Sequence, residues 1–276
     1  MIAPFVEIDW VEAHRGEVVF ADCRWYVDGR SGRAAYEGGH VPGAVFVDLD
    51  TALTCHADPA DAGRHPLPEL EAFATAMAAL GIGDDDTVVA YDDAGGVIAG
   101  RLVWMLRVTG HEAALLDGGL GAWRGALETT SADHEPADFT AREWPAERLV
   151  GIDEVAAVAE TSAGPVLIDA RRRERFEGEP DDLDPQAGHI PGALSVPCRE
   201  NLDADGRLLP VEELRARFDF GDADVISYCG SGVTACHNLL AMEQAGLGQG
   251  RLFAGSWSQW SRDPARPVQT GASPPS

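Results

Sequence analysis

The chain has 276 residues, and its 21 basic residues against 46 acidic ones give a formal net charge of −25. All 21 basic residues are arginines. This charge argues against nucleic acids and membranes as partners, because both require a cationic surface. No run approaches the ~18 apolar residues of a membrane span, and the first residues lack a secretory signal.

The five cysteines are scattered and contain no Cys-x-x-Cys pair. This pattern disfavours a zinc site and indicates free thiols in a reducing compartment. We therefore expect a cytoplasmic protein, without a metal ion or another cofactor.

The first half of the chain predicts alternating strands and helices. We expect strands at 17–24, 45–47, 87–91 and 113–116, and helices at 69–80 and 97–109. The first strand ends in Asp22-Cys23-Arg24, and Gly-His-Val-Pro-Gly-Ala at 39–44 precedes the second.

The second half repeats this order. A strand at 165–171 ends in Asp169-Ala170-Arg171, and Gly-His-Ile-Pro-Gly-Ala follows at 188–193. A strand at 223–227 and a helix at 234–245 come next, and 252–257 matches 115–120. Such repetition indicates two copies of one unit. We predict an α/β fold of two tandem domains, each a mostly parallel sheet flanked by helices.

The domain boundaries follow from composition. We expect a first domain at 1–127, a linker at 128–150, a second domain at 151–262 and a C-terminal tail at 263–276. The linker is rich in Thr, Ser, Pro and acidic residues with little periodicity, and the tail holds four prolines.

The stretch from Tyr228 to Thr234 places Cys229 between a strand end and a helix start. Glycines at 230 and 232 permit unusual backbone angles, and amides at a helix N-terminus favour negative charge. The pattern predicts a nucleophilic thiolate, with a buried core cysteine as the alternative. A cysteine phosphatase would need an arginine six positions after the cysteine. Ala235 stands there, so phosphoryl chemistry is disfavoured.

Taken together, these motifs resemble those of two-domain rhodanese-type sulfurtransferases. The resemblance covers the chain apart from the linker and the tail, and it implies that only the second domain is active. The first-domain equivalent of Cys229 is Asp92, which cannot carry a persulfide. Within the family, Gly230-Ser231-Gly232 is similar to the loop of 3-mercaptopyruvate sulfurtransferases. Enzymes that prefer thiosulfate tend to have an arginine and a lysine there.

The resemblance implies that Cys229 takes sulfur from 3-mercaptopyruvate as a persulfide and passes it to an acceptor. The acceptor would be a thiol, such as thioredoxin, or cyanide, and the protein would be a monomer. Two alternatives remain open. One is a thiosulfate–cyanide sulfurtransferase, and the other is a non-catalytic persulfide carrier or sulfur-binding module.

A proton relay is also implied by the resemblance. Ser231 would lie beside the sulfur, and His65 and Asp50 would complete a Ser-His-Asp arrangement in which the acid orients the imidazole. The alternative is that His65 is a surface loop histidine and Asp50 a turn or cap residue.

For the substrate carboxylate, the resemblance points to Arg175, whose fork suits bidentate binding. Family members usually carry a second arginine between this motif and the next Gly-His, but 176–187 contains none. Arg172 or Arg173 would be the substitute. The remaining residues expected to hold the substrate are Gly230, Gly232, Val233 and Thr234.

Overall fold

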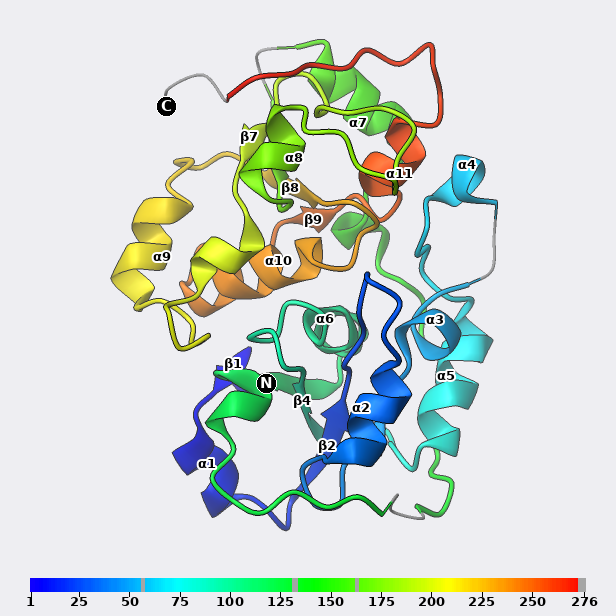
Figure 1. Cartoon of the computed structure of the whole chain (residues 1–276), viewed down its shortest axis with the longest axis vertical. Coiled ribbons are helices and arrows are strands. Elements are labelled where there is room, and N and C mark those ends of the chain that lie inside the picture. Colours follow the sequence, from blue (N-terminus) through cyan, green and yellow to red (C-terminus); the bar gives the residue numbers. More distant parts are fainter. Residues whose placement is uncertain (56–57, 131–133, 162–163, 273–276) are drawn as a thin grey trace. The chain divides into compact units, whose positions relative to one another are not determined.

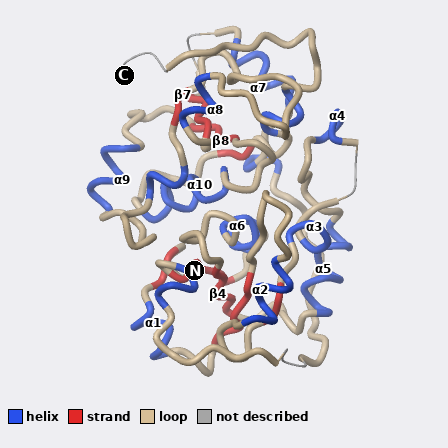
Figure 2. Tube along the Cα trace, viewed as in Figure 1, coloured by secondary structure: helices blue, strands red, loops and turns tan. Residues whose placement is uncertain are grey.

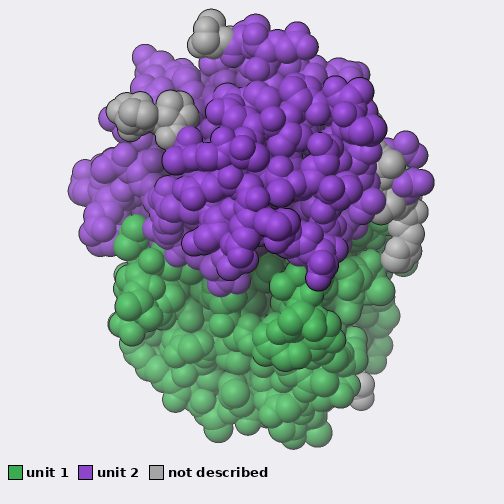
Figure 3. All heavy atoms as spheres, turned by 45° about the horizontal axis from the view of Figure 1, so that its top comes forward, with its two compact units in different colours: residues 1–55, 68–144, 202–209 green, residues 56–67, 145–201, 210–276 purple. Residues whose placement is uncertain are grey.

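The computed structural model describes residues 1–55, 58–130, 134–161 and 164–272. Residues 131–133 of the predicted linker and 273–276 of the predicted tail lie outside this description. The chain forms two compact units, coloured separately in Figure 3. Unit 1 comprises residues 1–55, 68–144 and 202–209, and unit 2 comprises 56–67, 145–201 and 210–276. In the part of the chain that is described, no helix is long and apolar enough to cross a membrane.

Unit 1 is built on a five-stranded parallel sheet with the order β1-β5-β4-β2-β3. Its central strand β4, labelled in Figure 2, pairs with β2 on one side and with β5 on the other. The strands are β1 Phe5–Val6, β2 Val18–Asp22, β3 Val45–Phe46, β4 Thr87–Tyr91 and β5 Glu112–Leu116. The helices are α1 Ile8–Ala13, α2 Gly32–Gly38, α3 Leu49–Ala52, α5 Leu70–Ala79, α6 Gly100–Val108 and the 3-10 turn η1 Gly119–Ala122.

Unit 2 has a four-stranded parallel sheet with the order β7-β6-β8-β9, of which β7, β8 and β9 are labelled in Figure 1. The strands are β6 Val166–Asp169, β7 Leu194–Ser195, β8 Val225–Tyr228 and β9 Arg251–Leu252. The helices are α4 Pro59–Ala62, α7 Ile152–Ala159, α8 Arg173–Glu177, α9 Val211–Arg217, α10 Ala235–Gln244, α11 Ser256–Trp260 and the 3-10 turns η2 Ala146–Arg148 and η3 Cys198–Asn201.

The strand order of the two sheets is the same. Strands β3, β2, β4 and β5 of unit 1 correspond to β7, β6, β8 and β9 of unit 2. The extra edge strand β1 has a one-residue counterpart, a parallel bridge between Leu149 and Leu252. The predicted α/β class, with two parallel sheets flanked by helices, is confirmed. The short strands β1, β3, β7 and β9 span two residues each, which is too short for a period-2 pattern to define their limits.

A buried ion pair follows the second strand of unit 1. Asp22 is fully buried and accepts hydrogen bonds from Nε and Nη2 of Arg24, whose Nη2 also donates to the Gly39 carbonyl. The arginine thereby joins the strand end to the turn before the next strand. The equivalent contacts in unit 2 are made by Arg171, Asp169 and Gly188.

Two short segments each fold with the unit that is formed mainly by the other half of the chain. Residues 56–67 belong to unit 2, where α4 packs against α11. Gly63 is fitted closely there, since a Cβ atom on it would lie 2.4 Å from the Gly255 carbonyl oxygen. Residues 202–209 belong to unit 1, where the Leu208 amide donates to Asp117.

The predicted linker is divided between the units, with 128–130 and 134–144 in unit 1 and 145–150 in unit 2, and the described part of the tail belongs to unit 2. In unit 1, the Asp84 amide donates to the Asp138 carbonyl. In unit 2, His189 and Gln269 form an antiparallel bridge. The Gly271 amide also donates to the Glu177 carbonyl, so the segment 263–272 is held along unit 2 as far as Gly271.

The loop after β4 holds a carboxylate in a cradle of amides. Asp92 is fully buried, and each of its two oxygens accepts two backbone N–H groups at 2.7–2.9 Å. The donors are Ala94 and Gly96 for Oδ1, and Ile98 and Ala99 for Oδ2. Burial raises the pKa of Asp92, and the four amide donors oppose this shift. In the loop of unit 1, the backbone amides thus bind the side-chain carboxylate of Asp92.

We predict that Asp92→Asn destabilises the protein by ~2 kcal/mol or more at pH 8. In either orientation, the new amide would present its NH2 group to two N–H donors and leave them buried without an acceptor. The measurement is the free energy of unfolding in a denaturant titration. Asp93→Asn is the matched control, because the exposed Asp93 accepts from the Tyr26 hydroxyl and an asparagine oxygen can do the same. Equal stability of both variants would contradict the role assigned to the cradle.

Candidate functional site

Cys229 directly follows β8, which lies between β6 and β9 in the sheet of unit 2. The residue is 2% exposed, its amide donates to Ser256 Oγ at 3.1 Å, and its carbonyl accepts from the Trp257 amide. Its Sγ accepts a hydrogen bond from the Gly232 amide at 3.1 Å. Cys229 is therefore buried, but its sulfur faces an N–H donor that favours a thiolate or a persulfide anion.

The two glycines of the loop serve different purposes. Gly232 has φ +77°, and a Cβ atom on it would lie 2.4 Å from the Ala254 carbonyl oxygen. Gly230 lacks a positive φ, but a Cβ atom there would lie 3.0 Å from Arg64 Nη2 and 3.4 Å from Arg175 Nη1. Gly232 thus shapes the loop, and Gly230 makes room for two guanidinium groups.

Val233 and Thr234 lead from the loop into α10. Their carbonyls accept the first turn of backbone hydrogen bonds, from the amides of Cys236 and His237. Val233 is 3% exposed. A direct role of these two residues in holding the substrate stays a prediction.

Ser231 and His65 meet within unit 2, although 166 positions separate them in the chain. Ser231 Oγ lies 2.7 Å from His65 Nδ1, and both residues are at most 9% exposed. His65 reaches Ser231 because the segment 56–67 belongs to unit 2. The alternative of a surface loop histidine is therefore wrong.

Asp50 lies in unit 1, on α3, with an exposed side chain. Its Oδ2 accepts a hydrogen bond from Trp25 Nε1 at 2.9 Å. The N-cap of α3 is Asp48, whose carboxylate accepts from the Asp50 amide. Asp50 is thus not the cap residue of this helix, and its part in a proton relay stays a prediction.

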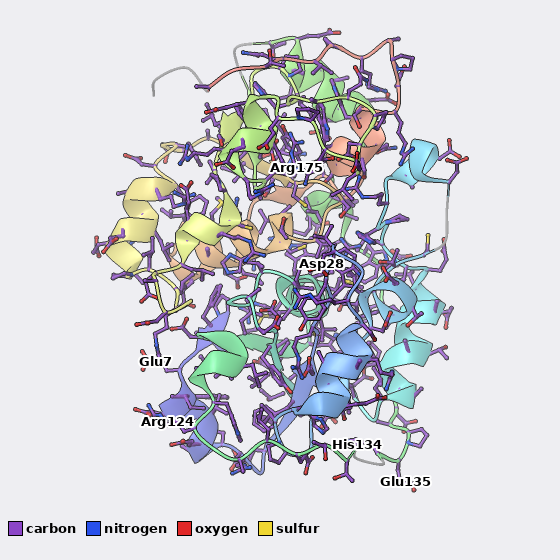
Figure 4. All side chains as sticks on the ribbon, in the orientation of Figure 1. Glu7, Asp28, Arg124, His134, Glu135 and Arg175 are labelled. Atoms are coloured by element: carbon purple, nitrogen blue, oxygen red, sulfur yellow. The ribbon has the colours of Figure 1, made fainter. Side chains whose placement is uncertain are left out.

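Arg175 extends from α8 and is labelled in Figure 4. Its guanidinium forms ion pairs with Asp181 and, at 2.9 Å, with Asp184. Asp184 also pairs with Arg64, a residue that no sequence motif indicated. The signal that was available is the position of Arg64 directly before His65.

The substitutes considered for a second substrate arginine are placed elsewhere. Arg173 forms two hydrogen bonds with the Glu200 carboxylate, at 2.7 and 2.6 Å. Arg172 is exposed at the N-terminal end of α8. Arg173 is therefore engaged in a surface ion pair, and Arg64 is the arginine that lies with Arg175 beside the Cys229 loop.

The other cysteines have environments that disfavour a thiolate. Burial raises the pKa of Cys198 to about 12, and burial together with Asp22 and Asp92 raises the pKa of Cys23 well above its ordinary value. Cys236 lies on α10, and its Sγ donates to the Gly232 carbonyl. Cys23 and Cys198 therefore remain thiols at neutral pH. Among the described residues, no group of three or more His, Cys, Asp or Glu is arranged to hold a metal ion.

Comparison with known protein families identifies both halves of the chain. The model of the rhodanese-like domain matches residues 7–126 and 153–263. A probable 3-mercaptopyruvate sulfurtransferase of Pseudomonas aeruginosa is 42% identical over 267 residues, which covers 92% of this chain and 93% of the relative. A putative thiosulfate sulfurtransferase, SseB, of Mycobacterium tuberculosis is 40% identical over 266 residues, covering 92% of this chain and 91% of the relative.

Solved structures agree with this assignment. The 3-mercaptopyruvate sulfurtransferase from Leishmania major has a TM-score of 0.84 at 31% identity, and the match covers 95% of this chain and 76% of that one. SseA from Escherichia coli, a 3-mercaptopyruvate sulfurtransferase, has a TM-score of 0.81 at 35% identity, with 93% and 99% covered.

We predict that Gly232→Ala destabilises unit 2 and slows alkylation of the Cys229 thiol. The new methyl group would collide with the Ala254 carbonyl and displace the amide that contacts the sulfur. Gly248→Ala is the matched control, since Gly248 also has a positive φ but a Cβ atom on it would meet nothing within 4 Å. The unfolding free energy of Gly232→Ala should fall by at least ~1 kcal/mol more than that of the control. If both variants lose the same free energy of unfolding, the close approach of Gly232 to the Ala254 carbonyl does not contribute to stability.

Proposed function

The chain belongs to the rhodanese family of two-domain sulfurtransferases, and on that premise we propose that it transfers sulfur from 3-mercaptopyruvate through a persulfide on Cys229. The acceptor would be a thiol or cyanide. The observation that supports this most is the Cys229 sulfur at the end of β8, which accepts the Gly232 N–H beside a Ser231–His65 pair.

The chemistry balances without an external oxidant or reductant. The Cys229 thiolate attacks the donor sulfur, the C–S bond of 3-mercaptopyruvate breaks, and the bonding electrons leave with the carbon as the enolate of pyruvate. The proton of the donor thiol ends on the methyl carbon of pyruvate, and Ser231 with His65 would carry it. A thiolate acceptor then attacks the outer sulfur and restores the Cys229 thiolate.

The charges around Cys229 favour a carboxylate donor over thiosulfate. Arg64 and Arg175 are matched by Asp181 and Asp184, so the cluster offers directed N–H donors without surplus positive charge. A monoanionic carboxylate needs such donors, whereas an inorganic dianion gains more from excess cationic charge. Thiosulfate remains the second candidate, because the Mycobacterium tuberculosis relative carries that name.

The proposal assigns different roles to the two domains. The domain at 1–127 would be the inactive copy, since Asp92 stands where the second domain, at 151–262, has Cys229. A thiol protein such as thioredoxin would serve as acceptor to a monomer in the cytoplasm. All five cysteines are free, which fits a reducing compartment, and the net charge of −25 argues against nucleic acid and membrane partners.

We predict that turnover with 3-mercaptopyruvate exceeds turnover with thiosulfate when cyanide is the common acceptor. After exposure to the donor alone, the intact mass should rise by one sulfur atom, ~32 Da, and Cys229→Ser should abolish both the mass increase and turnover. A large excess of thiosulfate activity would replace the proposed donor. An adduct without turnover would favour a persulfide carrier, and the absence of any adduct would defeat both ideas.

The relay makes a separate prediction about His65 and Ser231. General acid–base catalysis contributes ~10²–10⁴-fold, so His65→Ala and Ser231→Ala should each lower kcat at least ~10-fold. Because the two side chains act as a pair, the double variant should lose less than the product of the single losses. His134→Ala, at an exposed histidine of unit 1 (Figure 4), is the control. If the loss in kcat of the double variant equals the product of the two single losses, His65 and Ser231 act independently.

A further inference from the structure

Two guanidinium groups converge on the residue that follows the reactive cysteine. Arg64 Nη2 and Arg175 Nη1 lie 3.0 and 3.4 Å from the position of a Cβ atom at Gly230. Gly230 has no positive φ, and a side chain on it would press against the ends of both arginines. The ends of two cationic side chains therefore lie against the Cys229 loop.

In each arginine, the nitrogen nearest to Gly230 is not the one that binds an acidic residue. Arg175 Nη2, which binds Asp184, lies farther away, at 3.8 Å from the same Cβ position. Arg64 uses Nη1 for Asp184 and for the Leu183 carbonyl, and Arg175 uses Nη2 for Asp184 and Nε for Asp181. No described residue accepts a hydrogen bond from Arg64 Nη2 or from Arg175 Nη1. Each arginine thus presents a vacant donor on the side that faces the loop.

Asp184 holds the two arginines together. It is 2% exposed, and its two oxygens bind one guanidinium each, so it offsets the repulsion between two like charges at short range. Arg64 and Arg175 are 21% and 16% exposed, which keeps them accessible from outside the cluster.

The backbone of Arg64 is attached to the same elements as the cysteine loop. Its amide donates to Ser258 Oγ at 3.0 Å, and the Ser258 amide donates to the Gly230 carbonyl at 2.9 Å. The next residue, His65, binds Ser231. Arg64 is therefore fixed relative to Cys229 by short hydrogen-bonded connections and does not depend on a mobile side chain alone.

We propose that Arg64 and Arg175 together bind the carboxylate of the sulfur donor, one oxygen on each vacant N–H, with Arg64 as a specificity-determining residue. The inference rests on the proposed sulfur transfer, because it assigns the recognition of the donor at that same site. Two N–H groups, one from each guanidinium, suit the two oxygens of a planar carboxylate. The segment 176–187 supplies no other arginine, so the second cation comes from a distant part of the chain.

The test compares two donors that differ only in the carboxylate. 3-Mercaptopyruvate carries it, and 1-mercaptopropan-2-one has a methyl group in its place. In Arg64→Met, kcat/KM for 3-mercaptopyruvate should fall about 10- to 100-fold, as expected for one lost charge-assisted contact, while the value for 1-mercaptopropan-2-one should change less than about threefold. The kcat/KM of Arg64→Lys for 3-mercaptopyruvate should lie between the values of wild type and Arg64→Met. Arg262→Met is the control, since it removes an exposed arginine of unit 2 and alters net charge equally.

Equal losses on both donors, or no loss on either, would overturn the role of Arg64. A second measurement is calorimetric binding of 3-mercaptopyruvate to Cys229→Ser, with and without Arg64→Met, which requires no turnover. If Arg64→Met abolishes this binding, the inference is supported, whether or not wild type turns over 3-mercaptopyruvate. Inactivity of wild type with 3-mercaptopyruvate would refute the proposed donor instead. Retained binding in the double variant would refute the inference alone. If Arg64→Met fails to fold, Arg64→Lys carries the same comparison.

Discussion

A negative charge held at the start of a helix, where a buried parallel strand ends, is the constraint on which both halves of this chain depend. In unit 1, four amides bind the carboxylate of Asp92. In unit 2 the corresponding position is Cys229, whose sulfur accepts the Gly232 amide. The amides and the helix dipole favour an anion in either case. A carboxylate satisfies its loop permanently, whereas a sulfur can acquire and release a second sulfur atom.

The active loop also depends on residues that the sequence places in the other half of the chain. The segment 56–67 folds with unit 2 and brings Arg64 and His65 to the cysteine loop. Gly63 and Ser258 fix this segment against the start of α11, whose amides also bind the carbonyls of Cys229 and Gly230. Cys229, the Ser231–His65 pair and Arg64 are therefore connected by one set of hydrogen bonds, so a change in α11 would move them together.

The local parts of this architecture could be predicted from the sequence, and the long-range parts could not. The strand–loop–helix around Cys229 follows from an apolar run, two glycines and a helical period, all within about twenty residues. The buried Asp-x-Arg pairs lie two positions apart, so the pattern that predicts them is local. Arg64 meets Asp184 across 120 positions. No periodicity links such residues, and only packing of the folded chain brings them together.

Electrostatics explains why that packing matters for an anionic donor. A formal charge of −25 opposes the approach of any anion, but salt screens this field over ~8–10 Å. Within the cluster, two arginines and two aspartates cancel in formal charge, so attraction cannot come from a surplus of positive charge. What remains is the direction of the N–H groups. Selectivity at the Cys229 loop would then rest on the shape of the donor anion rather than on the size of its charge, and that shape is set by how Asp184 orients its two partners.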